Sequence, residues 1–523
     1  MRLTFFAMFI FFALFISLGF LFLSFLSSLN NTNKPKHSPL SSTHSPPSYP
    51  IIGCLISFYQ NRHRLLDWYT QHLSQSPTQT IVVRRLGSRH TIVTANPINI
   101  EYILKTNFKN FPKGKPFTEI LGDLLGCGIF NVDGELWSTQ RKLASHEFST
   151  RSLKEFIVKT LEEEVQQRLI PLLESASNNN NVLDLQDILR RLTFDTICKV
   201  SLGNDPCCLD LSKPLPPLLT AFDTASEISA MRATAPLFLM WKIKRALNLG
   251  SEKSLKEAVK LVHESVHKMI AIKKKEIRSV RKGDAGNDLL TKLLEMGHDE
   301  IMVRDMVISM IMAGRDTTSA AMTWLFWLLS EQPSKAELIV KEVKEVFGGK
   351  NNGGEVDELM RPFDYEGLKE MKFLKACLCE SMRLYPPVAW DSKHAASEDV
   401  LPDGTLVNKG DRVTYFPYGM GRMEMLWGKD FDEFKPDRWF NEPGEDHING
   451  VLKSVNPYKF PVFQAGPRVC LGKEMAFIQM EYVVASILNR FEIRPVSVDQ
   501  PVFVPLLTAH MAGGFKVRVH KRT

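Results

Sequence analysis

A ten-residue stretch near the C-terminus, residues 463–472, constrains the fold of this chain more than any other feature. It reads Phe-Gln-Ala-Gly-Pro-Arg-Val-Cys-Leu-Gly, so Cys470 stands between Gly466 and Gly472. After Gly472, apolar residues recur at helical spacing, which predicts a tight loop that leads into a helix. The helix dipole and free backbone N–H groups stabilise a thiolate at a helix N-terminus, and glycines let a backbone approach a flat ligand closely. The pattern favours a ligand-binding cysteine over a buried structural one.

This stretch resembles the haem-binding loop of the cytochrome P450 family, in which the cysteine is the proximal ligand of iron. The resemblance rests on Phe463, Gly466, Arg468, Cys470 and Gly472, which keep the family's spacing. It implies haem b (iron protoporphyrin IX) as the cofactor and Cys470 as the metal ligand, with Phe463, Gly466 and Gly472 beside the haem. In that family the thiolate pushes electron density onto iron and favours O–O cleavage.

Residues 299–332 are predicted to form one long helix that ends before Pro333. Its middle contains Gly314, which costs roughly 1 kcal/mol there relative to alanine, and Thr317, whose hydroxyl can bond back to the carbonyl of Ala313. An acid beside a hydroxyl is expensive in an apolar helix unless it is used. The segment resembles the distal helix of the same family, where the glycine opens a groove for dioxygen. Asp316 and Thr317 would then be catalytic, with Asp316 leading to a proton relay, which implies a monooxygenase that uses O2.

Two further sets of residues follow the family pattern. Trp137 and Arg141 lie four apart on one helix face, and the resemblance implies that they and Arg468 hold the haem propionates, for which guanidinium groups are well suited. The acid and base of a Glu-x-x-Arg segment can pair on a helix. The resemblance implies a buried structural triad of Glu380, Arg383 and Arg438.

The pattern along the rest of the chain predicts a mainly α fold with small β-sheets. Two alternating runs, 80–85 and 90–95, predict a β-hairpin, and further strands are expected near 412–415, 491–495 and 515–520. The resemblance to the P450 family covers about residues 50–523 and implies one haem-thiolate monooxygenase domain, residues 51–523.

The N-terminus carries a separate signal. Residues 3–29 contain no charged residue, and roughly 20 apolar residues suffice to cross a bilayer, so residues 1–29 are predicted to be a transmembrane anchor. A cleaved signal peptide would have a shorter apolar core. Basic residues follow the run more than they precede it, which places the catalytic domain in the cytosol. Together with a Pro-rich linker at 30–50, this predicts a single-pass protein of the endoplasmic reticulum membrane.

The net charge and the cysteine content limit which partners and which cellular compartment are expected. The net charge of +7 comes from 65 basic and 58 acidic side chains, and no basic cluster interleaved with aromatic residues indicates a nucleic-acid partner. A mildly basic surface suits contact with anionic lipid or with an acidic redox partner, and the family resemblance implies NADPH-cytochrome P450 reductase. The eight cysteines form no Cys-x-x-Cys pair, so we expect free thiols in a reducing compartment and no zinc site.

Longer stretches are similar to plant ω-hydroxylases of fatty acids and their derivatives: residues 143–148, 384–395 and 461–476. Residues 110–117, the Trp390-containing stretch and residues 505–514 resemble the branch that hydroxylates the terminal (ω) carbon of jasmonoyl-isoleucine, an oxylipin hormone conjugate. This resemblance implies 12-hydroxylation of that lipid-derived substrate; the alternatives are a free fatty acid as substrate, or a non-catalytic haem protein. A desolvated carboxylate needs a cationic partner. Lys113 or Lys115 is therefore expected to anchor the substrate carboxylate, with Val388 and Trp390 along the channel for its tail.

Overall fold

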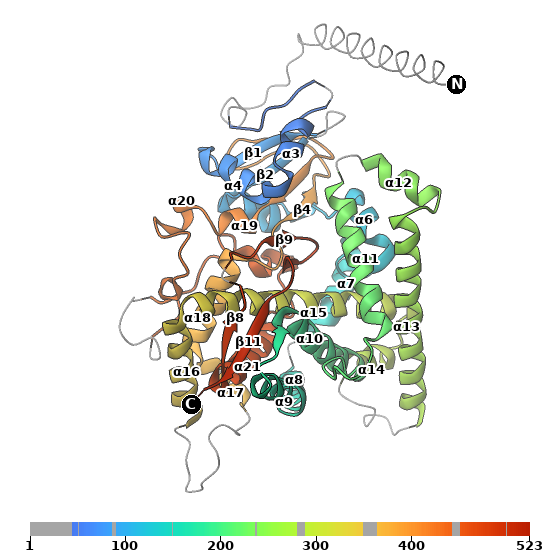
Figure 1. The fold of residues 1–523 in the computed structure, drawn as a ribbon. Helices are drawn as coiled ribbons and strands as arrows, with labels where there is room; N and C mark the ends of the chain where they lie inside the picture. Colours follow the sequence, from blue (N-terminus) through green and yellow to red (C-terminus); the bar gives the residue numbers. More distant parts are fainter. Residues whose placement is uncertain are drawn as a thin grey trace, which may run out of the picture.

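The computed structural model describes residues 44–50, 52–85, 90–148, 150–235, 238–279, 288–348, 363–441, 450–497 and 499–522. Helices dominate it (Figure 1). The helices are α3 (Leu55–Gln60), α4 (Leu65–Gln75), α5 (Pro97–Glu101), α6 (Lys115–Leu125), α7 (Gly134–Phe148), α8 (Arg151–Glu164), α9 (Ile170–Asn178), α10 (Leu185–Leu202), α11 (Pro217–Thr234), α12 (Phe238–Ala246), α13 (Ser251–Ser279), α14 (Leu289–Glu295), α15 (Glu300–Glu331), α16 (Pro333–Gly348), α17 (Tyr365–Glu370), α18 (Lys372–Leu384), α19 (Pro417–Met420), α20 (Glu424–Trp427) and α21 (Lys473–Arg490).

Four small sheets complete the described fold. The largest has the order β1-β2-β7-β4, built from β1 (Thr80–Arg84), β2 (His90–Thr94), β7 (Arg412–Tyr415) and β4 (Asp391–His394). The others are β3 (Val182–Asp184) with β11 (Lys516–Lys521) and β8 (Phe491–Pro495), β10 (Ala509–Met511) with β9 (Phe503–Pro505), and β5 (Asp399–Val400) with β6 (Leu406–Val407). The expected pairing of residues 80–85 with 90–95 is confirmed by the antiparallel register of β1 and β2, and the three other expected strands are β7, β8 and β11.

Helix α15 crosses the middle of the molecule (Figure 1). Asp299 caps its first turn by accepting a hydrogen bond from the N–H of Ile301 at 3.0 Å, and the helix ends one residue before Gln332, as predicted from the sequence. Its C-terminal half packs with α18 and α21 in the largest apolar cluster, which contains Trp324 and Tyr482, while its N-terminal half packs with α11 and α13 in a second cluster. A third cluster joins α4 to the four-stranded sheet. The cysteine loop described below contacts all three clusters, through Phe463, Leu471 and Ala465.

The predicted anchor, residues 1–29, lies outside the described residues. Within the described ranges, no helix is both long and apolar enough to cross a membrane. The end of the predicted linker contacts the globular part: Ser45 Oγ accepts a hydrogen bond from the N–H of Val82 at 3.1 Å, and Ser57 Oγ donates to the carbonyl of Pro47 at 3.2 Å. Residues 44–50 are therefore packed against the domain.

Candidate functional site: a cysteine loop facing the central helix

The loop that carries Cys470 is shaped by its backbone. It contains two 3₁₀ turns, η8 (Pro461–Phe463) and η9 (Gly466–Arg468), and the N–H of Cys470 donates to the carbonyl of Phe463 at 2.8 Å. Gly466 has a φ of +66°, and a Cβ there would lie 2.2 Å from the carbonyl oxygen of Leu104. Only glycine fits this position without moving the backbone.

Gly472 is the N-cap of α21 and brings the start of that helix to Cys470. A Cβ on Gly472 would lie 3.9 Å from Cys470 Sγ. The thiol has an accessible surface, yet burial within the protein raises its pKa, and the Gly472 N–H, Arg141 and Lys473 act in the opposite direction. An accessible thiol inside a protein lines an internal space. The start of α21 and the cations Arg141 and Lys473 lie near this thiol. Such surroundings favour a thiolate ligand.

Two features mark the middle of α15: a threonine hydroxyl that bonds to the helix backbone, and a close contact with α10. Thr317 Oγ1 donates to the carbonyl of Ala313 at 2.7 Å, as the sequence predicts. A Cβ on Gly314, the glycine expected to open a groove for dioxygen, would lie 2.6 Å from Ile197 Cδ1 of α10. This glycine lets α10 and α15 approach each other. Ala313 and Thr317 are only half-buried on a helix whose neighbouring turns are buried, so α15 also borders an internal space.

Asp316 lies in a charged network that joins three helices. Its carboxylate accepts from Arg315 Nε at 2.6 Å, and Arg190 Nε of α10 lies 3.7 Å away. Both arginines also pair with Asp223 of α11, at 2.5 and 2.6 Å. Burial alone would raise the pKa of Asp316, but the two arginines outweigh it and the pKa is lowered. The carboxylate is therefore anionic and connected to half-exposed Asp223.

His510 of β10 lies beside the same network. Burial lowers its pKa and Arg190 adds to this, while Asp316 opposes the shift. The sequence does not indicate Arg190, Asp223 or His510 as site residues, because their relation to Asp316 depends on how elements distant in the sequence pack. The run of Arg315 and Asp316 in an otherwise apolar helix was the one available signal.

Three cationic or aromatic side chains gather beside the cysteine loop. Arg468 Nη2 donates to Asp133 at 2.8 Å and to the carbonyl of Val132, and its guanidinium lies 4.6 Å from the ring centre of Trp137. Arg141 is on α7 together with Trp137. Burial lowers the pKa of Arg141, with Cys470 opposing the shift, and no carboxylate of the described residues lies within ion-pair distance of its guanidinium.

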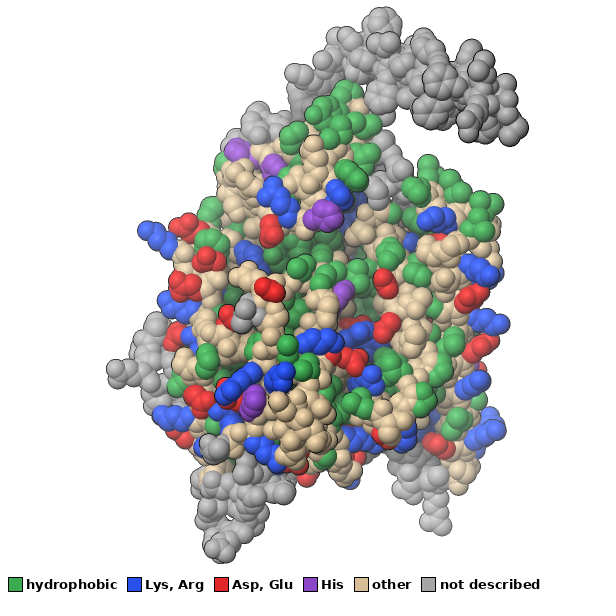
Figure 2. Space-filling view, in the orientation of Figure 1, with side chains coloured by type: hydrophobic (Ala, Val, Ile, Leu, Met, Phe, Trp, Pro, Cys, Tyr) green, Lys and Arg blue, Asp and Glu red, His purple; other side chains and the backbone are tan. Residues whose placement is uncertain are grey.

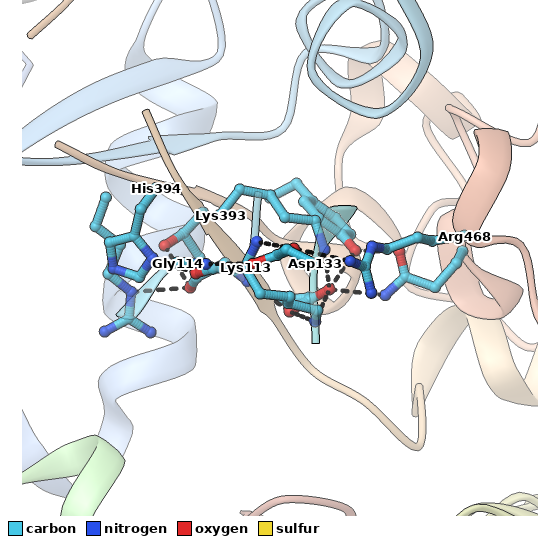
Figure 3. A network of polar contacts seen from close by, with 12 residues as sticks. Lys113, Gly114, Asp133, Lys393, His394 and Arg468 are labelled. Atoms are coloured by element: carbon cyan, nitrogen blue, oxygen red, sulfur yellow. Dashed lines mark hydrogen bonds and ion pairs between the residues drawn. The ribbon is translucent and has the colours of Figure 1, made fainter. Parts of the chain in front are cut away.

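Lys113 belongs to a buried network rather than to an open site (Figure 3). Its Nζ donates to both carboxylate oxygens of Asp391, at 2.9 and 3.0 Å, and lies 4.2 Å from the ring centre of Phe117. Lys393 donates to the same carboxylate at 3.0 Å. Asp391 also accepts from Tyr415 at 2.7 Å and from Gln464 of the cysteine loop at 2.9 Å.

The start of α6 is attached to Arg468 through Asp133 (Figure 3). Asp133 accepts from the N–H of Lys113 at 3.0 Å and from the N–H of Gly114 at 3.1 Å, as well as from Arg468. A Cβ on Gly114 would lie 2.8 Å from the Cβ of His394. The network thus holds residues 113–114, strand β4 and the cysteine loop together.

The other expected substrate residues are placed differently. The side chain of Lys115 is 86% exposed and lies 3.9 Å from Glu119, so it faces solvent. Lys113 is already neutralised by Asp391, and neither lysine is a free cation at an internal space. Val388 is half-buried, and Trp390 stacks on Phe416 with ring centres 6.1 Å apart.

Glu380, Arg383 and Arg438 form a buried ion-pair triad. Arg383 Nε lies 2.8 Å from Glu380 Oε2 and Arg438 Nε lies 2.7 Å from Glu380 Oε1. Trp439 Nε1 also donates to Glu380 at 2.9 Å. Arg383 in addition donates to the carbonyls of Gly421, Phe431 and Glu433. Such a fully satisfied set ties α18 to the segment 421–439, and breaking one pair costs about 3–5 kcal/mol.

The residues present fit a haem. Cys470 offers an accessible thiol, Gly466 and Gly472 leave two positions of the loop without side chains, and Arg141 is a desolvated cation that lacks an acidic partner in the described part of the chain. A flat, iron-containing group with carboxylates meets each of these needs. The fold and the site thus define the class of haem-thiolate proteins.

Comparison with known proteins gives the family. The model of the cytochrome P450 family matches residues 43–511. Cytochrome P450 94B1 of Arabidopsis thaliana is 61% identical over 482 residues, 92% of each chain, and cytochrome P450 94B3 of the same plant is 59% identical over 510 residues, 97% of this chain and 98% of the relative. Cytochrome P450 94A2 of Vicia sativa is 46% identical over 500 residues, 94% of each chain. This chain belongs to the cytochrome P450 family, whose members are monooxygenases that use haem b, O2 and electrons from a reductase.

Proposed function

We propose that this P450 monooxygenase hydroxylates the terminal carbon of jasmonoyl-isoleucine. The supporting observation is that the three stretches resembling the jasmonoyl-isoleucine branch lie against one another. The N–H of His394 donates to the carbonyl of Pro112 at 2.9 Å, and the N–H of Ala509 donates to the carbonyl of Pro387 at 2.8 Å. Residues 110–117, 384–395 and 505–514 thus form one continuous wall, which a substrate would contact as a unit.

In this proposal the chain's own residues have distinct roles. Cys470 ligates the haem iron, Arg141 and Arg468 hold the haem carboxylates, and Trp137 fixes Arg468 by stacking. The haem supplies the activation of O2 when it is bound. Thr317 would hold a proton at its hydroxyl on the half-buried face of α15, and Asp316, the next residue in the sequence, is linked to half-exposed Asp223 through Arg190 and Arg315. Phe463, Gly466 and Gly472 shape the loop, and the buried triad around Glu380 holds the segment behind it.

The electron donor we propose is NADPH-cytochrome P450 reductase. Lys142 and Lys473 are exposed on α7 and α21, the helices that adjoin the cysteine loop. An acidic protein surface would be attracted to such lysines.

We also propose that the protein sits on the endoplasmic reticulum membrane through residues 1–29, with its domain in the cytosol. Exposed apolar side chains support this: Tyr59 of α3 is 65% exposed and Leu239 of α12 is 69% exposed. Both helices lie at the same end of the molecule, where hydrophobic side chains gather on the surface (Figure 2). Apolar patches of this kind mark membrane or protein contacts.

Microsomes containing the protein and the reductase test the substrate. Jasmonoyl-isoleucine and lauric acid are incubated separately with NADPH, and the products are separated by mass. We expect a 12-hydroxy product from the conjugate at a higher rate than any ω-hydroxy product from lauric acid. Cys470→Ala microsomes serve as the control for other oxidases. Faster conversion of lauric acid would make the protein a fatty-acid ω-hydroxylase, and haem binding without conversion of either compound would indicate a non-catalytic haem protein.

A further inference from the structure

A small cavity opens between the four-stranded sheet and the end of α11. Its volume is about 50 Å³, which holds a few atoms of a ligand, since one water needs roughly 10–15 Å³. Much of its wall is apolar and aromatic, and includes Phe58, Leu65, Trp390 and Phe416. Arg85 and Arg412 also line it. Figure 2 shows the molecular surface hollowed between the part that carries β1 and β2 and the part that carries α11 and α12.

The two arginines have no acidic partner in the described part of the chain. Arg412 Nε donates to Ser392 Oγ at 2.9 Å, and neither guanidinium lies within 4 Å of a described carboxylate. Burial lowers the pKa of Arg412 to about 9, and the charge of Arg85 adds to the effect. Asp391 is the acid that acts on Arg412, but it is bound by Lys113 and Lys393. Arg85 is exposed and Arg412 is half-buried. A half-buried cation beside an apolar wall and a like charge is costly unless an anion joins it.

The chain between the cavity and the neighbourhood of α15 is short, which limits the distance between them. Asp316 acts on His510, and the neighbouring Ala509 is hydrogen-bonded to Pro387. From Pro387 the chain passes Val388 and Trp390 to Ser392, the partner of Arg412. Five residues span at most about 17 Å. A molecule with its head at the arginines and its tail along residues 387–390 therefore points its far end toward α15.

We propose that Arg412 and Arg85 bind the carboxylate of the substrate and so fix which end of it reaches the haem. The inference rests on the proposed function, because it requires a substrate with an acid at the end remote from the oxidised carbon. Guanidinium groups bind carboxylates in a bidentate, charge-assisted geometry, and Trp390 and Phe416 supply an apolar wall next to the acid. The arginines take the role that the sequence analysis expected of Lys113 or Lys115.

The test compares acids with their methyl esters on the full-length holoprotein. Optical titration of the haem band gives the affinity for jasmonoyl-isoleucine, lauric acid and both esters. In the wild type, at least one acid is expected to bind about 10–100-fold more tightly than its ester. Arg412→Gln and Arg85→Gln should each reduce this ratio, the double variant should bring it close to one, and ester affinity should stay the same.

Further variants distinguish the two cavity arginines from other cationic residues. Arg84→Gln changes an adjacent arginine that is exposed as Arg85 is, and Arg84 does not line the cavity. This variant should keep the full ratio. Lys115→Ala should keep it as well, and Arg412→Lys should restore part of it. An acid preference that survives in the double variant, or a wild type that binds ester and acid equally, overturns the proposal. The wild-type ratio and Arg85→Gln decide the question if Arg412→Gln fails to bind haem.

The same titration distinguishes this inference from the proposed function. If only lauric acid shows an arginine-dependent preference, the cavity binds carboxylates but jasmonoyl-isoleucine is not the substrate. If jasmonoyl-isoleucine is hydroxylated with an acid preference that the arginine variants leave intact, the function holds and the cavity assignment is wrong.

Discussion

At the scale of single residues, Cys470 is positioned by backbone contacts and not by side-chain partners. Its N–H is bonded to Phe463, and Gly466 and Gly472 leave space around the thiol. A substitution at Cys470 therefore removes the sulfur without removing the loop.

Cys470→Ala should abolish the red-shifted carbon monoxide spectrum that thiolate ligation of haem produces. Because the alanine has no donor atom, the reduced protein should show no thiolate-type band, and hydroxylation should fall to background. The measurement is a reduced carbon monoxide difference spectrum, with Cys379→Ala as a matched control, since that cysteine lies on α18. A normal thiolate-type band in Cys470→Ala would refute the assignment.

Thr317→Ala should keep haem binding but waste reducing equivalents. In the proposed role, removing the hydroxyl removes the proton donor on the half-buried face of α15, so product formed per NADPH should fall and hydrogen peroxide should rise. Thr317→Ser keeps a hydroxyl and should retain most of the coupling. Unchanged coupling in the alanine variant would show that Thr317 only contributes its bond to Ala313.

At the scale of elements, the contact of α10 with α15 depends on Gly314. Alanine there would gain roughly 1 kcal/mol of helix propensity, but its Cβ would lie 2.6 Å from Ile197 Cδ1 and 2.7 Å from Cγ1. Overpacking of this kind costs about 1–3 kcal/mol. The clash therefore outweighs the propensity gain.

We expect Gly314→Ala to lower thermal stability and haem content, and the double variant Gly314→Ala/Ile197→Val to recover part of both. The double-mutant cycle measures the coupling between the two helices, for which contacting residues give about 0.5–3 kcal/mol. Additive effects of the two substitutions would show that the helices separate without cost at this point.

Helix α21 contains a buried acid that makes stability depend on pH. Glu481 is 3% exposed, one of its carboxyl oxygens has no hydrogen-bond partner among the described atoms, and burial raises its pKa to about 8, with Lys375 opposing. The folded state thus holds a proton between pH 4.5, the ordinary value, and about pH 8 that the unfolded state releases. Stability from this group is complete below pH 4.5 and is lost as pH rises to about 8.

Glu481→Gln should flatten this dependence. Between pH 6 and pH 8, the unfolding temperature of the wild type should fall more than that of the variant, because glutamine does not ionise. Glu264→Gln, a change on the exposed side of α13, should leave the wild-type slope unchanged. The check is thermal unfolding by circular dichroism, and equal slopes in wild type and Glu481→Gln would contradict the prediction.

The elements specified by neighbouring residues could be predicted from the sequence. The long helix α15, the hairpin of β1 and β2 and the turn of the cysteine loop each depend on short-range pattern, caps or glycines. The pairing of Arg315 with Asp223 spans 92 residues and that of Lys113 with Asp391 spans 278, so no local pattern indicates either. The short strands β3, β5, β6, β9 and β10 were not predicted for another reason: two or three residues carry no periodicity.

At the scale of the whole molecule, the proposed membrane attachment involves two separate parts of the chain. The predicted anchor comes first in the sequence, and α12 adds exposed Leu239 and Ile243, four residues apart on one helix face. An amphipathic helix can lie in the membrane interface without crossing it.

Deleting residues 1–30 should weaken membrane attachment but keep the haem domain. The truncated protein should still bind phospholipid vesicles in part, and Leu239→Asp/Ile243→Asp in that background should release several-fold more of it into the supernatant. Sedimentation with vesicles measures this, and the haem spectrum reports folding. Loss of haem on truncation, or equal sedimentation of both proteins, would contradict this division of the chain.

The Asp391 network has a consequence for how such an enzyme changes its preferences over generations. Asp391 is the first residue of β4 and accepts a hydrogen bond from Gln464 of the cysteine loop, and Trp390 is the residue just before it. Mutations at positions 388–390 can therefore remodel the wall that meets a new substrate, while the carboxylate next to them keeps the metal site in register. The residue proposed to contact the substrate, Trp390, and the residue that holds the cysteine loop, Asp391, are therefore neighbours in the sequence.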